Sequence, residues 1–108
     1  MNMEERLTMY NEKKTFVDGI SEVFRKNTKG SSVTEIKYEV YQKEIEDRIC
    51  FREWVIVHYV GGGKCACTVS GNNNSGIFTV IGKFLNGGYY EEAESYKALF
   101  EQGWVQVI

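Results

Sequence analysis

The sequence has no proline, a single histidine and no long apolar run. Without proline, no prolyl isomerisation can slow folding. No apolar stretch approaches the roughly 20 residues that a membrane-spanning helix needs. The first residues, MNMEERLTMYNEKK, lack the apolar core of a signal peptide. The chain is therefore expected to be cytoplasmic and to have no membrane partner.

Neither sign of charge is in clear excess. Thirteen Lys and Arg residues nearly balance fifteen Asp and Glu residues, so the formal net charge is −2. General nucleic-acid binders usually offer phosphates a clear excess of basic residues, and this class is disfavoured. Cysteine is limited to three residues, an odd number, and free thiols in a reducing compartment are the simpler interpretation.

What the sequence does contain is a normal apolar share for a folded domain and many aromatic residues. With 108 residues, of which 43% are hydrophobic, we expect one domain over residues 1–108. Seven Tyr, six Phe and two Trp exceed what one small core easily buries. Some should lie at the surface, where Tyr and Trp suit protein interfaces.

Periodicity predicts an α+β domain in the order α-β-β-β-β-α-β. The spacing of Phe16, Val17, Ile20, Val23 and Phe24 predicts one apolar stripe on a long N-terminal helix. We expect a mainly antiparallel, four-stranded sheet with helices on one face, giving two layers, and a short C-terminal strand. The predicted helices are 3–29 and 89–102, and the predicted strands are 32–42, 49–60, 64–70, 77–84 and 104–108.

The second and third strands form a hairpin through the glycines at 61–63, and this hairpin holds the histidine and all three cysteines. Pairing centred on Gly62 places Cys65 and Cys67 opposite the apolar face of the second strand. Cys50 and His58 then point the other way. No CxxC pair is present either. We therefore expect no metal site, no cofactor and no Cys–His catalysis, although a slip of one residue in the register would reverse this prediction.

Two other kinds of enzyme site are weakly indicated. The acidic residues gather on a connecting loop at 43–48 and at the start of the second helix, where solvated charge is normal and no cleft is implied. Gly61-Gly62-Gly63-Lys64 leads into a strand, whereas a phosphate-binding loop leads into a helix. The chain is therefore expected not to be an enzyme.

Aromatic stacking offers an alternative function. Trp54 and His58 share one strand face with Arg52, and Tyr41 is expected nearby. An open sheet face with aromatic residues can stack the bases of single-stranded RNA or DNA. The opposing interpretation is that a helix covers this face or that it serves a protein partner.

The whole chain resembles the anti-CRISPR proteins, small phage- and mobile-element-borne inhibitors of bacterial defence nucleases. The resemblance is in size, an N-terminal helix, an antiparallel sheet, mild acidity and the ending Glu101-Gln102-Gly103-Trp104. It implies a non-enzymatic protein-binding inhibitor, with a CRISPR-associated nuclease as the partner. Acidic residues would occupy a basic nucleic-acid channel. The expected partner-binding residues are Tyr89, Tyr90, Glu91, Glu92 and Glu94, with Glu44, Glu46 and Asp47 as a second patch. A homodimeric accessory subunit is a separate alternative that does not depend on the resemblance.

Overall fold

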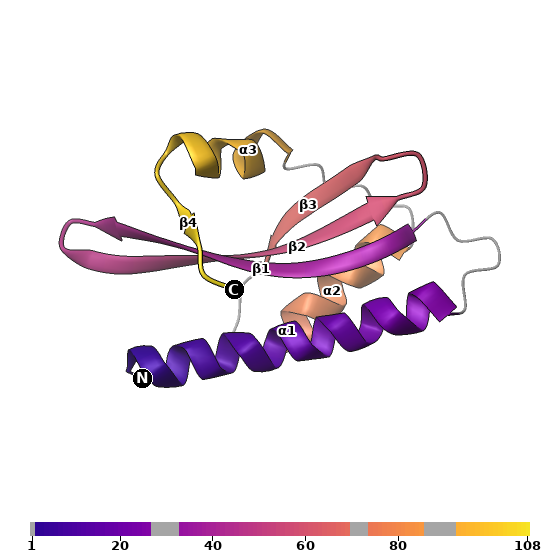
Figure 1. Ribbon diagram of the computed structural model, residues 1–108, viewed down its shortest axis with the longest axis horizontal. Coiled ribbons are helices and arrows are strands. Elements are labelled where there is room, and N and C mark those ends of the chain that lie inside the picture. Colours follow the sequence, from indigo (N-terminus) through magenta and orange to yellow (C-terminus); the bar gives the residue numbers. More distant parts are fainter. Residues whose placement is uncertain (1, 27–32, 70–73, 86–92) are drawn as a thin grey trace.

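A four-stranded sheet lies between helices in the computed structural model (Figure 1), which describes residues 2–26, 33–69, 74–85 and 93–108. The predicted α+β class, the long N-terminal helix, the antiparallel sheet and the short C-terminal strand are confirmed. No helix in these described ranges is long and apolar enough to cross a membrane. The elements are α1 (Met3–Lys26), β1 (Val33–Ile45), β2 (Arg48–Tyr59), β3 (Lys64–Val69), α2 (Ser75–Leu85), α3 (Ala93–Glu101) and β4 (Val105–Gln106).

The strand order in the sheet is β3-β2-β1-β4, and each neighbouring pair is antiparallel. β1 and β2 form a long hairpin that ends at the pair Ile45↔Arg48. Residues 43–48, expected as a connection between strands, mostly extend this hairpin, and only Glu46 and Asp47 form the turn. β4 pairs with β1 of its own chain through Tyr41↔Gln106 and Gln42↔Val105, which decides where the terminal strand lies.

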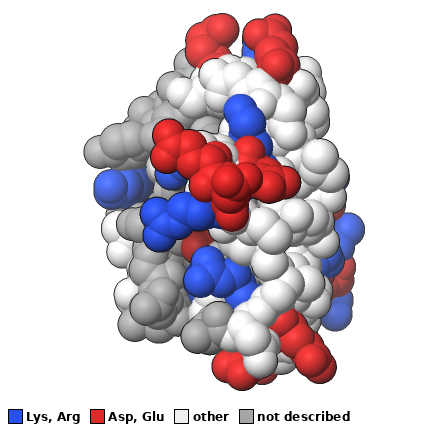
Figure 2. Space-filling model, turned by 90° about the vertical axis from the view of Figure 1, so that its left-hand side faces the viewer, with Lys and Arg blue, Asp and Glu red and all other residues white. Residues whose placement is uncertain are grey.

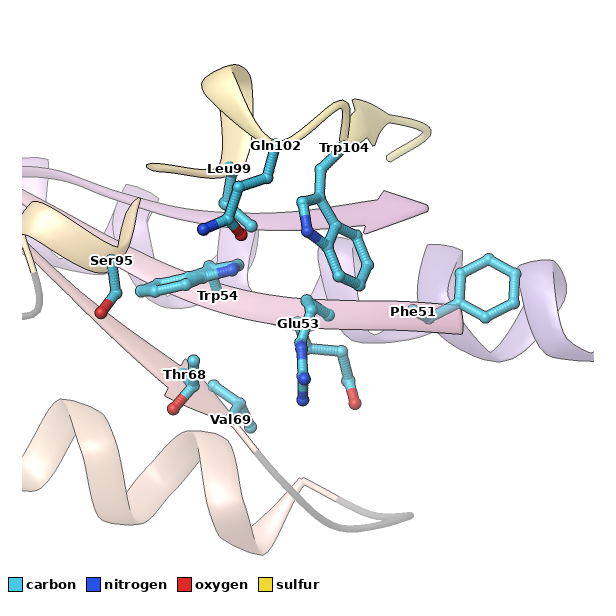
Figure 3. A pocket seen from close by; sticks show the side chains of 10 residues that line it. Phe51, Glu53, Trp54, Thr68, Val69, Ser95, Leu99, Gln102 and Trp104 are labelled. Atoms are coloured by element: carbon cyan, nitrogen blue, oxygen red, sulfur yellow. The ribbon is translucent and has the colours of Figure 1, made fainter. Parts of the chain in front are cut away.

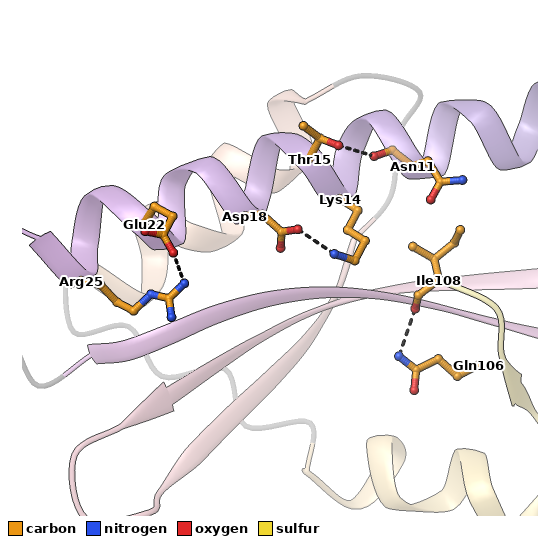
Figure 4. Close-up of polar contacts among 8 residues, drawn as sticks. All are labelled: Asn11, Lys14, Thr15, Asp18, Glu22, Arg25, Gln106 and Ile108. Atoms are coloured by element: carbon orange, nitrogen blue, oxygen red, sulfur yellow. Dashed lines mark hydrogen bonds and ion pairs between the residues drawn. The ribbon is translucent and has the colours of Figure 1, made fainter.

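Helix α1 lies along one face of the sheet (Figure 1). Tyr10 and Val17 are buried against the sheet, as the spacing predicts. Val23 is 58% exposed, so its expected place in the apolar stripe is wrong. The flank of the helix beside β1 carries two half-exposed ion pairs, Lys14–Asp18 and Glu22–Arg25 (Figure 4). Pairs of this kind keep the solvent side of a helix polar and stabilise it only slightly.

The largest correction concerns residues 77–84, which form most of helix α2 and not a strand. Their apolar residues have helical spacing: Ile77, Val80 and Ile81 lie at i, i+3 and i+4, and all three are buried. Four of these eight residues, Ile77, Thr79, Val80 and Ile81, are β-branched, which is typical of a strand. Burial of one helical face overrides this signal, because propensity is a weak prior beside packing.

The predicted two-layer arrangement, with helices on one face, is also wrong, because both faces of the sheet are covered. α1 and α2 pack on the face that carries Ile36, Tyr38 and Val40. α3 packs on the other face, over Tyr41 and Trp54 (Figure 1). Alternation along residues 32–42 predicts a solvated face with Glu35, Lys37, Glu39 and Tyr41, and this prediction is wrong at Tyr41, which is 1% exposed. β2 has buried residues on both faces, which confirms that it is central.

Candidate binding site

The thiols of Cys65 and Cys67 lie on the opposite face of the sheet from Cys50 and the His58 imidazole, as the sequence predicts. The observed register pairs Val57 with Cys65 and Val55 with Cys67, whereas pairing centred on Gly62 would put Val57 opposite Cys67. The register therefore differs by two residues from the prediction. A shift by an even number leaves every side chain on the predicted face. Cys65 and Cys67 are buried in the core under α1 and α2, whereas Cys50 packs in the cluster under α3. Within the described ranges, no group of three or more His, Cys, Asp or Glu residues is placed to hold a metal ion.

The face proposed for stacking nucleic-acid bases is covered. Trp54 is only 2% exposed and contacts Tyr96 of α3 at a ring-centroid distance of 5.4 Å, so the prediction of an open tryptophan is wrong. Tyr41 is buried in the same cluster. Arg52 is exposed, and its guanidinium carbon lies 5.7 Å from the centre of the Trp104 ring. His58 is half-buried at the far end of β2, opposite Lys64.

The residues expected to bind a partner fall into two groups. Tyr89, Tyr90, Glu91 and Glu92 lie outside the described residues, and Glu94 is exposed in the first turn of α3. Glu44, Glu46 and Asp47 are exposed at the tip of the β1–β2 hairpin. The structure thus places the second patch on a single, well-defined element.

That element is an arm, residues 43–50, in which β1 and β2 pair only with each other among the described strands. It extends along the long axis of the molecule, which measures 48 Å (Figure 1). Figure 2 faces this end of the molecule, where acidic side chains gather at the centre of the view beside Lys and Arg. All residues from 44 to 49 are exposed, including Ile45 (40%) and Ile49 (48%).

A hollow of about 670 Å³ lies at the base of the arm, under α3 (Figure 3). It begins where β3 ends, because β3 pairs with β2 only from Glu53 to His58. Its walls are residues 51–54 of β2, residues 68–69 at the end of β3, and Ser95, Leu99, Gln102 and Trp104 from α3 and the segment that follows it. Both tryptophans of the chain therefore face one cavity.

One polar atom at this hollow has no partner. The indole nitrogen Nε1 of Trp54 is buried and makes no hydrogen bond within the described structure. Figure 3 shows it on the side of the ring that faces Trp104 across the hollow. Almost all buried N–H groups in native proteins are hydrogen-bonded, so an unpaired one calls for an explanation. An acceptor supplied by a ligand is one such explanation.

The carboxylate at the hollow, that of Glu53, is already paired from the other side of the sheet. Its Oε1 accepts hydrogen bonds from Lys13 Nζ at 2.7 Å and from the Tyr38 hydroxyl at 2.5 Å. Burial, and then the hydrogen bond to Glu53, hold the pKa of Tyr38 well above its ordinary value of 10.0. The Lys13 side chain is 3% exposed, so this ion pair fixes α1 against β2 in a nearly dry environment.

A second carboxylate, that of Glu39, joins α3 to the sheet. Its Oε1 accepts hydrogen bonds from the hydroxyls of Tyr41 at 2.8 Å and Tyr96 at 2.5 Å. Burial raises the pKa of Tyr96 to about 12, and the hydrogen bond to Glu39 adds to the rise. The group can hold α3 in place, but the geometry puts no other reactive group beside it.

Sequence reasoning missed Glu53, Ser95, Gln102 and Trp104 as residues of a site. A usable signal was present in the lengths of the segments. The turn-forming run from Gly71 to Gly76 follows Cys65 after only five intervening residues, so the third strand cannot match the length of the second. The first half of β2 must then lack a partner on that side. Comparison with known proteins adds nothing to this geometry, since no family model, no curated protein and no solved structure matches the chain.

Proposed function

We propose that this protein is a non-enzymatic inhibitor that binds another protein through the hairpin arm. The observation that carries the proposal is the arm itself, a two-stranded projection whose residues 44–49 are all exposed. Ile45 and Ile49 stand on opposite faces of this ribbon, since Ile45 pairs with Arg48 and Ile49 pairs with Glu44. An exposed isoleucine on each face suits a partner that encloses the ribbon in a cleft.

The charges at the tip indicate what kind of cleft. Glu44, Glu46 and Asp47 outnumber the two basic residues beside them, Lys43 and Arg48. A basic channel that normally holds nucleic acid complements such a tip, because opposite potentials speed association and fix the orientation of docking. The sharpest form of the proposal is therefore an inhibitor of a bacterial defence nuclease, as in the anti-CRISPR proteins, which fills the channel in place of nucleic acid.

The cysteines support a cytoplasmic setting for this activity. Cys50, Cys65 and Cys67 are all free thiols. Free thiols persist where the compartment is reducing, as in the cytosol. We therefore place the partner in the same compartment.

The proposal is tested by pull-down of the tagged protein from its native cells, with mass spectrometry of what is retained. A variant with Ile45→Ser and Ile49→Ser, and another with Glu44, Glu46 and Asp47 changed to Lys, should each lose the partner. The matched control changes three exposed acids of α1, Glu4, Glu5 and Glu12, to Lys, and should keep it. If all variants retain the partner equally, the proposal is contradicted. If the captured partner does not bind nucleic acid, the narrower proposal of a nuclease inhibitor is contradicted.

A further inference from the structure

At the base of the arm, one edge of β2 has no paired strand among the residues that the structure describes. The N–H of Tyr59 donates to the carbonyl of Gly63 at 2.8 Å, so the backbone of Tyr59 faces β3. Every second residue of a strand faces the same neighbour, and Phe51 and Ile49 therefore direct their N–H and C=O groups to this side. β3 has ended at Val69, opposite Glu53, and no described strand pairs with β2 beyond that point. Unpaired edges of this kind accept an added strand.

The hollow lies at the same place, and two of the groups beside it are donors that no carboxylate meets among the described residues. The indole N–H of Trp54 makes no hydrogen bond within the described structure, although only 2% of the residue is exposed to solvent. The Arg52 guanidinium lies over the Trp104 ring and has no carboxylate partner among the described residues. Glu53 is neutralised by Lys13 at 2.7 Å. The Arg52 guanidinium and the Trp54 indole N–H then remain, and a positive charge beside an N–H donor favours binding of a carboxylate.

We propose that an extended peptide segment adds to β2 in line with β3, and that an acidic side chain of this segment enters the hollow. Residues opposite Arg52 in an added strand point to the same face as Arg52 and Trp54. An Asp or Glu there can reach both groups. The inference rests on the proposed function in one respect, because it assumes that the segment belongs to a partner protein.

The geometry also says how the carboxylate gains access. The Trp54 nitrogen is closed to water, so a lining side chain must move before an acceptor can reach it. Gln102 is exposed and lines the hollow, so we infer that its side chain is the one that rotates. Side-chain rotation of this kind is common when a partner binds.

The two tryptophans provide a direct measurement, since the chain has no others and both line the hollow. The probe is a blocked peptide, KTVEVT, titrated against the full chain while tryptophan emission is recorded. We expect saturable binding with a dissociation constant of about 0.1–1 mM. The matched peptide KTVQVT should bind about tenfold more weakly, because it lacks the charge. A KTVEVT peptide with an N-methylated backbone amide, and free glutarate, should bind as weakly or not at all.

Variants of the protein complete the test. Arg52→Gln should weaken binding of KTVEVT about tenfold, and Trp54→Phe, which removes the N–H and keeps a ring, about threefold. Arg48→Gln is the matched control on the same strand and should change nothing. The inference is overturned if KTVEVT does not bind, if KTVQVT or glutarate binds equally well, or if Arg52→Gln has no effect. It is also overturned if light scattering shows that a second copy of the chain fills this edge.

The two proposals fail separately. Ile45 lies on β1, outside the edge of β2 that the peptide would join, so the variant Ile45→Ser alone should bind KTVEVT normally. Loss of selectivity for KTVEVT, with partner capture in the pull-down unchanged, refutes the peptide site and leaves the arm proposal standing. If KTVEVT binds selectively and the partner is still captured by every arm variant, the arm proposal is refuted and the peptide site stands.

Discussion

The two faces of the sheet differ in how the polar groups beneath their helices are hydrogen-bonded. Under α1 and α2, several polar groups that enter the core are hydrogen-bonded to one another. Lys13 meets Glu53, Tyr38 donates to Glu53, and the N–H of Ile36 donates to the buried hydroxyl of Ser21 at 3.0 Å. Under α3, the cluster is smaller, a hollow remains, and the N–H of Trp54 is unpaired. The face under α1 and α2 provides stability, and the hollow on the face under α3 is where the proposed ligand can gain contacts.

The largest test of this contrast compares two isoleucines of the sheet. Ile36 and Ile56 are each 2% exposed, on the face under α1 and on the face under α3 respectively. Ile36→Ala should lower the free energy of unfolding by about 4 kcal/mol, and Ile56→Ala by about 2 kcal/mol, because the smaller cluster beside a hollow can relax. Urea denaturation followed by circular dichroism measures both. Equal losses would mean that the two faces are packed equally tightly.

The next test breaks the buried ion pair. Lys13→Met should cost about 3 kcal/mol of unfolding free energy, since Glu53 is then left nearly buried without its cation. The neighbouring Lys14 gives the matched control, because its pair with Asp18 is half exposed and its replacement by Met should cost less than about 0.5 kcal/mol. Similar values for the two variants would show that the Lys13–Glu53 pair is not what closes this face.

The smallest effect appears only at high pH. The pKa values of Tyr38, Tyr41 and Tyr96 are raised in the fold above 10.0, chiefly by burial. Well below pH 10 these hydroxyls are protonated in both the folded and the unfolded chain, so their contribution to stability is fully present and does not change with pH. Above pH 10, the unfolded chain loses protons first and stability falls as pH rises. Tyr96, at about 12, should ionise before Tyr38, so α3 should loosen before α1. Tyrosinate absorbance at 295 nm, compared between wild type and Tyr96→Phe, checks the order.

The sequence predicted well those features that depend on a two-residue or 3.6-residue repeat over a long stretch. α1, β1, β2 and the central position of β2 follow from such patterns. The separation of His58 from Cys65 and Cys67 also followed, because only an odd error in register could have reversed it. These predictions needed no knowledge of distant contacts.

The features that sequence reasoning missed depend on what packs over a given residue. Nothing local to Trp54 says that α3 will cover it, and nothing local to Glu53 says that Lys13, forty residues earlier, will neutralise it. Ile77, Val80 and Ile81 did carry helical spacing, but a short apolar run fits a strand and a buried helix almost equally well. The hollow is likewise a product of three elements that meet.

The turn at the tip of the arm carries one more consequence. Glu46 and Asp47 adopt φ values of 51° and 61°, a left-handed backbone that glycine and asparagine occupy with least strain. Aspartate tolerates this conformation, whereas a glutamate there costs on the order of 1 kcal/mol. Asn-Gly in the same two positions would make a firmer tip and would erase two of its three carboxylates. The chain therefore keeps two carboxylates, those of Glu46 and Asp47, at positions of the arm where the backbone conformation favours glycine or asparagine.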